Sequence, residues 1–167
     1  MSMHPVSQRP DLRPLFGALT DEENGALLDQ LQLVDDDLAQ LAAEASAHVG
    51  VPYREVALHL SLRPDGTARG IDGGPSGEAG DIWFDISGAD GIAGPPWSVE
   101  SRLVVFCADS PEPRGESSTH DLVRLEATCE TPTAVVEQLQ QHVSAMRIEV
   151  LRHPREGITS TRHARLP

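Results

Sequence analysis

The feature that most restricts the fold is a long apolar stripe in the first third of the chain. Thr20 and Glu23 have the spacing of a capping box, which predicts the start of an α-helix, and Gly50 predicts its end after Val49. Between them, apolar residues recur at alternating steps of four and three: Leu27, Leu31, Val34, Leu38, Leu41 and Ala45. A helix of roughly 30 residues is about 45 Å long, so its stripe needs a long apolar surface to cover.

Two partners for this helix are possible. The same steps fit a coiled-coil seam, but they last for less than three heptads, so we favour packing on a sheet of the same chain. A strand of eight residues spans only about 26 Å. We therefore expect the helix to bend or to overhang its sheet.

A second amphipathic helix is predicted near the end of the chain. Thr131 suits the N-cap and Pro132 the first helical position. Its apolar stripe consists of Val135, Leu139, Val143, Met146 and Val150.

Four segments between the helices alternate apolar and polar residues, as strands with one buried face do. They lie at about 56–63, 82–86, 99–108 and 122–129. The segment 64–80 has six glycines and two prolines and predicts a flexible loop. Short loop connections favour an antiparallel meander.

The predicted fold is therefore α+β, with a four-stranded antiparallel sheet in the order α-β-β-β-β-α. Both helices should cover one face in a two-layer arrangement, leaving the other face open. We expect a flexible N-terminal segment over 1–19, one domain over 20–153 and a basic flexible tail over 154–167. That tail could also bind an acidic partner or the acidic part of the chain itself.

The register of the last hairpin can be predicted by matching apolar faces. Val105 opposite Leu125 would place Cys129 opposite Ser101, about 20 Å from Cys107. A disulfide needs a far shorter separation. We expect both cysteines to be reduced core residues.

The chain carries 26 acidic and 13 basic residues, no lysine, and a net charge of -13. Such a surface repels phosphate backbones, which argues against nucleic acid as a partner. No apolar run reaches the length of a membrane helix and the first residues lack a signal-peptide pattern. The sequence therefore predicts a cytoplasmic protein without membrane contact, and its arginine-rich composition suggests a bacterial source.

No catalytic or metal-binding motif stands out. The seven histidines lack zinc-site spacing, the glycine-rich stretch lacks the lysine of a phosphate-binding loop, and there is no nucleophile elbow. The consecutive Asp35, Asp36 and Asp37 point in different directions on a helix and suggest a solvated face or a bend. We expect neither a metal nor a cofactor.

The open sheet face is the strongest candidate for function. It is predicted to carry six candidate interface residues: Trp83, Val104, Phe106, Leu122, Arg102 and Arg124. Apolar patches rimmed by charge commonly mark interfaces. Alternatively, the loop 88–97 with Trp97 folds over this face and extends the core.

Our leading hypothesis is a non-catalytic protein-interaction module, either a homodimer or a subunit of a bacterial complex. Chaperone, adaptor and immunity-like roles fit this description. The alternative is a small-molecule-binding protein or enzyme with a pocket between sheet and helices, using Asp85, His59 and His120. Asp85 and Glu126 could form a carboxylate pair, although cross-strand ion pairs with nearby arginines are the simpler explanation.

Overall fold

We describe a computed structural model of the chain over residues 1–107 and 118–159. The described elements follow in the order β1 (Ser2–Pro5), the 3-10 helix η1 (Val6–Gln8), α1 (Arg13–Phe16), α2 (Asp21–Val49), β2 (Tyr53–Leu62), β3 (Ala68–Gly77), β4 (Gly80–Ser87), β5 (Trp97–Cys107), β6 (Ser118–Cys129), α3 (Pro132–Arg152) and α4 (Arg155–Thr159). No helix in this part of the chain is long and apolar enough to cross a membrane.

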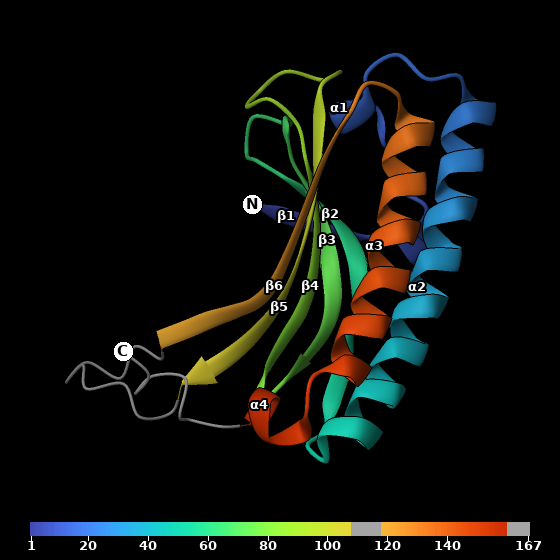
Figure 1. The fold of residues 1–167 in the computed structure, drawn as a ribbon. Helices are drawn as coiled ribbons and strands as arrows, with labels where there is room; N and C mark the ends of the chain where they lie inside the picture. Colours follow the sequence, from blue (N-terminus) through green and yellow to red (C-terminus); the bar gives the residue numbers. More distant parts are fainter. Residues whose placement is uncertain (108–117, 160–167) are drawn as a thin grey trace.

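The strands form one antiparallel sheet in the order of the sequence, β1 to β6. Helix α2 packs on β2 and β3, and α3 packs on β4, β5 and β6. Figure 1 shows the two long helices side by side against the sheet, with no described helix on the opposite face. The α+β class and the antiparallel sheet are confirmed. The predicted four strands are wrong, because the described residues form six, and short helices precede α2 and follow α3.

The two long helices begin where their capping residues predict. Thr20 Oγ1 accepts a hydrogen bond from Glu23 N at 3.1 Å, and Glu23 Oε1 accepts one from Thr20 N at 3.0 Å. Gly50 ends α2 in the left-handed conformation, and Thr131 caps α3 by accepting from Ala134 N. The apolar stripes of both helices are buried in the core.

The predicted glycine-rich loop is wrong over most of its length, because 68–77 form the strand β3. Its glycines allow the neighbouring backbones to approach closely. A Cβ on Gly70 would lie 2.2 Å from Ile86 O, and one on Gly74 would lie 2.1 Å from Ile82 O. Glycine here therefore serves strand packing and not loop flexibility.

Much of 1–19, for which the sequence predicts a flexible segment, belongs to the fold. β1 pairs with β2, and four apolar side chains of this segment enter the core: Val6, Leu12, Leu15 and Phe16. Trp97 packs against Phe16 in an edge-to-face contact and donates a hydrogen bond from Nε1 to Leu15 O at 2.9 Å. Trp97 is therefore buried in the core and does not cover the open sheet face.

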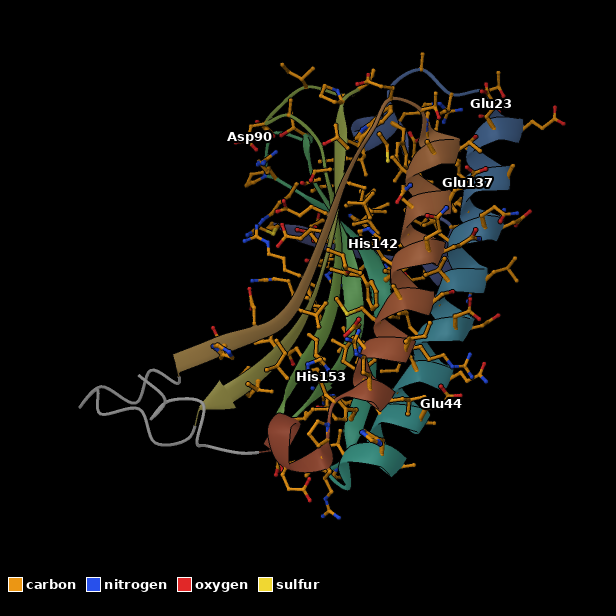
Figure 2. All side chains as sticks on the ribbon, viewed as in Figure 1. Glu23, Glu44, Asp90, Glu137, His142 and His153 are labelled. Atoms are coloured by element: carbon orange, nitrogen blue, oxygen red, sulfur yellow. The ribbon has the colours of Figure 1, made fainter. Side chains whose placement is uncertain are left out.

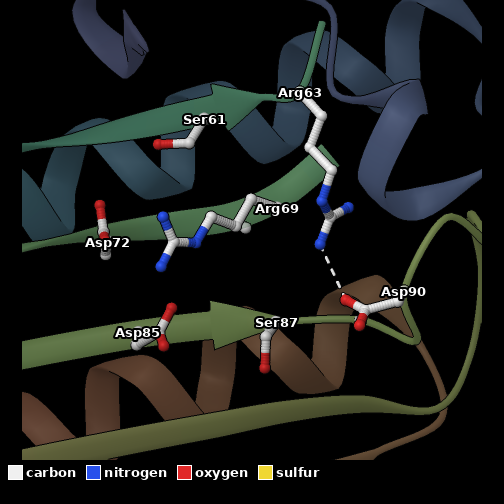
Figure 3. Close-up of a pocket in the computed structure, with 9 residues that line it drawn as sticks. Ser61, Arg63, Arg69, Asp72, Asp85, Ser87 and Asp90 are labelled. Carbon is white, nitrogen blue, oxygen red and sulfur yellow. Dashed lines mark hydrogen bonds and ion pairs between the residues drawn. The ribbon is translucent and has the colours of Figure 1, made fainter. Parts of the chain in front are cut away.

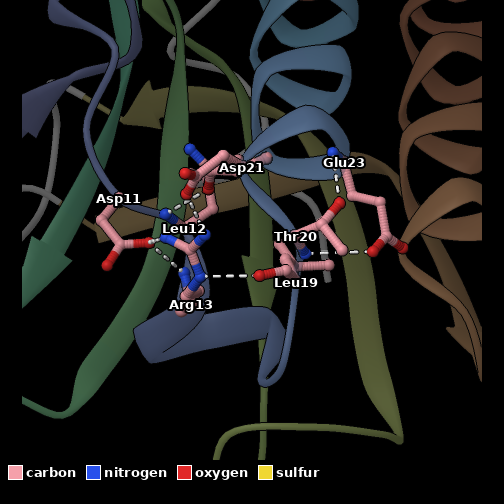
Figure 4. A network of polar contacts seen from close by, with 8 residues as sticks. Asp11, Leu12, Arg13, Leu19, Thr20, Asp21 and Glu23 are labelled. Atoms are coloured by element: carbon pink, nitrogen blue, oxygen red, sulfur yellow. Dashed lines mark hydrogen bonds and ion pairs between the residues drawn. The ribbon is translucent and has the colours of Figure 1, made fainter.

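Arg13 ties this segment to the start of α2. Its guanidinium contacts Asp11 at 3.0 Å and Asp21 at 2.6 Å, and its Nε donates to Leu19 O at 2.8 Å (Figure 4). Asn24 Oδ1 accepts from Leu12 N at 2.8 Å. These contacts satisfy backbone groups of a segment that composition alone describes as irregular.

At the other end, the predicted flexible tail begins inside the fold. α4 places Ile158 in the core with 1% of its surface exposed, and residues 160–167 of the predicted tail lie outside the described residues. A hydrogen-bonded contact of 2.7 Å between His48 Nε2 and His153 O joins the ends of α2 and α3.

The register of β5 and β6 differs from the prediction by four residues. Leu125 lies opposite Ser101, and Cys129 lies opposite Trp97. Cys107 pairs with Ser118 at the far end of the hairpin, and Cys129 is a buried free thiol. A shift by an even number keeps side chains on their predicted faces, so the assignment of faces holds where Trp97–Leu103 pairs with Val123–Cys129. Beyond the bulge between Leu103 and Val104 the shift is five residues, and the alternation of β6 changes there.

Candidate functional site

Four acidic side chains form a row across the open sheet face. Asp72 lies directly opposite Asp85, Asp85 opposite Glu100, and Glu100 opposite Glu126. Like charges at opposed positions of neighbouring strands are destabilising. We call these four residues the acidic row. The fold retains an arrangement that its own stability disfavours, as functional sites often do.

A bulge in β2 positions the histidine at one end of this row. The pairing of β2 with β3 shifts between Val56 and His59, which leaves Leu58 N without its regular strand partner. Asp35 of α2 accepts from that N–H at 2.7 Å. Asp35 is therefore buried and supports the bulge, unlike the solvated face that the sequence predicts. Burial raises the pKa of its carboxyl, which the Leu58 hydrogen bond partly offsets.

His59 forms an ion-pair contact with Asp72, with 2.7 Å between Nε2 and Oδ1. The other ring nitrogen, Nδ1, lies 3.2 Å from Ala57 O. Because a carbonyl oxygen can only accept, Nδ1 makes this hydrogen bond in the form that carries the proton. The contact between Nε2 and Asp72 lacks hydrogen-bond geometry, because Asp72 Oδ1 is buried without a hydrogen-bond partner among the described residues. Burial raises the pKa of Asp72, and the charges of His59 and Arg69 act in the opposite direction.

Asp85 has no ion pair among the described residues, in contrast to Asp72. Burial, together with the charges of Asp72 and Glu100, raises its pKa to about 6, and Arg102 and Arg69 oppose this shift. The carboxyl is therefore close to its titration point at neutral pH. Perturbed carboxyls of this kind are candidates for binding or proton transfer.

A polar hollow of about 300 Å³ lies over this end of the row (Figure 3). Its lining consists of Ser61, Arg63, Arg69, Gly70, Asp72, Asp85, Ser87, Gly88 and Asp90. At its rim Arg63 contacts Asp90 at 2.8 Å. Figure 3 shows the Arg69 side chain extending over the strands toward Asp72 and Asp85.

A second, shallower hollow of about 410 Å³ lies farther along the same face. Trp83, Val104 and Phe106, which we call the Trp83 patch, line it together with Arg102. Trp83 and Phe106 are partly exposed, whereas Val104 is buried. The structure therefore brings four of the six predicted interface residues together.

The other two predicted interface residues have different surroundings. Arg124 lies opposite Arg102 and forms ion pairs with Glu100 at 3.3 Å and Glu126 at 2.7 Å. Leu122 packs against the core that faces the helices. Its predicted position on the open face is wrong, because a bulge in the β5–β6 pairing changes the alternation at this point.

The residues predicted for a small-molecule site are brought together only in part. Asp85 and His59 flank Asp72 on the open face, away from the helices. His120 is exposed near the start of β6, six residues from Glu126 and about 20 Å along the strand. Sequence analysis missed Asp72 and Ser61 as site residues. Asp72 lay in a predicted loop, and Ser61 resembled an ordinary polar residue of a strand.

A buried serine–histidine pair lies on the opposite side of the sheet. Ser101 Oγ is 3.1 Å from His142 Nδ1, and Figure 2 shows His142 between α3 and the sheet. Both residues are almost fully buried, and burial lowers the pKa of His142. Without access for a substrate, this pair is a structural contact of the core and not a nucleophile with its base.

No family model, curated protein or solved structure matches this chain. Within 1–107 and 118–159, no group of histidine, cysteine, aspartate or glutamate side chains is arranged to hold a metal ion. The open sheet face must therefore be interpreted from its own charges and contacts.

Asp85→Asn is expected to stabilise the fold at about pH 7.5 by about 1 kcal/mol, after allowance for solvent screening. The folded-state pKa of Asp85 is raised above its ordinary value of 3.8 to about 6, so the wild type loses stability as pH rises through this window. The gain should therefore shrink toward about pH 4. Urea unfolding at both pH values measures it, with exposed Asp37→Asn as control; an equal gain at both would contradict the predicted cause.

Proposed function

We propose that this chain is a non-catalytic protein-interaction module whose open sheet face binds a partner protein with basic side chains. The observation that carries the proposal is the acidic row, in which four carboxyl groups oppose one another across β3 to β6. His59, Arg102 and Arg124 already contact the other three carboxyl groups, whereas Asp85 has no ion pair among the described residues. Basic side chains of a partner would relieve the repulsion that remains. The acidic row therefore favours the complex with a basic partner over the free protein.

The Trp83 patch supplies the apolar part of the same surface. It borders Arg102, and Arg102 contacts Glu100 of the acidic row at 3.5 Å. Aromatic and arginine side chains are enriched among residues that dominate binding energy. The combination favours a partner segment in which an apolar side chain lies next to basic ones.

Charge also distinguishes between a foreign partner and a second copy of the chain. The net charge is -13, and two copies joined through this face would bring two acidic rows into one interface. Uncompensated like charges across an interface are costly. We therefore favour a basic heterologous partner over the homodimer that the sequence also allows, and we expect a monomer by size exclusion with light scattering.

Selection of random peptides displayed on phage tests this proposal, because it does not require the partner to be identified first. Peptides that bind the immobilised native chain should be enriched in arginine or lysine next to aromatic or aliphatic residues. Their affinity should fall at least about tenfold for the double variant Trp83→Ser, Phe106→Ser, because truncation of interface aromatic residues commonly costs that much or more.

The matched control is the double variant Leu33→Ser, Ile148→Ser. Both residues are exposed apolar side chains, at 54% and 65%, but they lie on α2 and α3 and not on the open face. Peptide affinity should be unchanged in this variant. Selection of acidic peptides, or an equal loss of affinity in both double variants, would overturn the proposal.

A further inference from the structure

The polar hollow differs chemically from the rest of the open face, because it contains groups without partners of their own. Around it, charged side chains are paired: Arg63 with Asp90, His59 with Asp72, and Glu100 with two arginines. Inside it, neither Asp85 nor Arg69 forms an ion pair with any described residue. Within 1–107 and 118–159, Arg69 donates only to Met1 Sδ, at 3.9 Å.

Ser61 is the second and independent sign of a binding site. It is only 7% exposed, yet it lines the hollow from β2. Its hydroxyl has no hydrogen-bond partner within the part of the chain that the structure describes. The Ser61 oxygen is not one of the fully buried unpaired atoms of the described residues, so it is open to the hollow and can hydrogen-bond to water or to a ligand there.

The unpaired groups carry opposite charges. Figure 3 shows Arg69 and Asp85 on neighbouring strands, on the same face of the sheet, with Ser61 across the hollow. A simple cation would meet two arginines, and a simple anion would meet Asp72, Asp85 and Asp90. An uncharged apolar ligand would leave the charged groups desolvated and unpaired.

We propose that the polar hollow binds a small zwitterion of the amino-acid class. The ligand's ammonium group donates to the Asp85 carboxylate, and its carboxylate accepts from the Arg69 guanidinium, whose planar fork suits a carboxylate. The Ser61 hydroxyl hydrogen-bonds to the bound ligand. A volume of about 300 Å³ is at the lower end of the range for small-molecule pockets, which agrees with a compact ligand.

The polar hollow shares Asp72 and Asp85 with the acidic row, but no residue of the Trp83 patch lines it, so variants of the patch distinguish the two proposals. The double variant Trp83→Ser, Phe106→Ser should therefore lose affinity for the selected peptides but keep its affinity for the zwitterion.

Titration calorimetry and amide NMR shifts with each free L-amino acid at about pH 7.5 test the inference. At least one should bind with a Kd below about 1 mM. Its amide, which lacks the carboxylate, and its N-acetyl form, which lacks the ammonium, should each bind at least about tenfold more weakly, because each leaves one charged group unpaired.

Two variants of the hollow, Asp85→Asn and Arg69→Gln, should each weaken binding at least about tenfold. Asp85→Asn is also expected to stabilise the fold, so its loss of binding cannot be ascribed to unfolding. Asp121→Asn on β6 and Arg152→Gln on α3 lie outside the hollow and should leave affinity unchanged. No binding of any amino acid at about 10 mM, equal binding of either analogue, or full binding by the hollow variants would overturn the inference.

Discussion

Gly74→Ala is expected to lower the free energy of unfolding by about 3–5 kcal/mol, one of the two largest effects predicted for this chain. Gly74 has a φ of +145°, and a Cβ there would lie 2.1 Å from Ile82 O and 3.2 Å from a ring carbon of Phe84. Ile82 O belongs to the backbone of β4, so relief of the clash requires separation of β3 from β4. Urea unfolding followed by circular dichroism measures the loss.

Gly25→Ala is the matched control for this substitution. Gly25 lies inside α2, and the nearest atom to an added Cβ is an Arg9 side-chain nitrogen at 3.6 Å, an ordinary contact. Alanine there should stabilise the fold by about 1 kcal/mol, because glycine is a poor helix former. Opposite signs for the two variants would establish that β3 needs its glycines for close strand packing. A change below about 1 kcal/mol at Gly74 would restore the flexible-loop interpretation.

The glycines of β3 also explain why sequence analysis found four strands instead of six. Apolar alternation identifies strands through side chains, and 68–77 has few large ones to alternate. The close approach of the neighbouring backbones is a property of the folded sheet and leaves no periodic signal. β1 was missed for a related reason, since four residues are too short for a pattern.

The helices were predictable because their signals are local. Thr20, Glu23 and Gly50 mark the ends of α2 within a few residues of sequence, and Thr131 with Pro132 marks the start of α3. Strand register depends on contacts between distant residues, and matching apolar faces allows any even shift. The sequence therefore predicted the faces of β5 and β6 correctly up to the bulge that displaces Leu122, but placed the paired strands four residues out of register there.

The same distinction between local and distant signals applies to the candidate site. Trp83 and Phe106 were found because alternation places them on the open face, and Asp85 was found in the same way. The contact of Asp72 with His59 depends on β3 and on the bulge that Asp35 supports from α2. Neither the strand β3 nor the bulge in β2 was recognised in the sequence. The acidic row and the polar hollow therefore emerged only from the structure.

The acidic row also illustrates an exchange of stability for function. Asp85 has a pKa raised to about 6, because it is half-buried between two other carboxyls, and a neutral side chain would suit the free fold better. Residues that destabilise their own fold are expected where binding needs them. Asp85→Asn should separate the two effects, since it is predicted to stabilise the protein and to weaken zwitterion binding.

Phe16→Ala is expected to cost about 3–5 kcal/mol of unfolding free energy, although Phe16 lies in a segment whose composition predicts flexibility. Its side chain is 4% exposed and packs edge-to-face on Trp97, with 5.3 Å between ring centroids. Truncation would leave a cavity beside Trp97 and weaken the attachment of 1–19 to the sheet. Chemical denaturation measures the loss of unfolding free energy. Tryptophan fluorescence, to which Trp83 also contributes, reports the change around the Trp97 indole.

The control for this last substitution is Leu33→Ala on α2, where the side chain is 54% exposed and a change of about 0.5 kcal/mol or less is expected. A large loss for Phe16→Ala with a small one for Leu33→Ala would show that the N-terminal segment is part of the cooperative fold. Equal small losses would mean that 1–19 is a dispensable extension, and the core would then have to be stable without Leu12, Leu15 and Phe16.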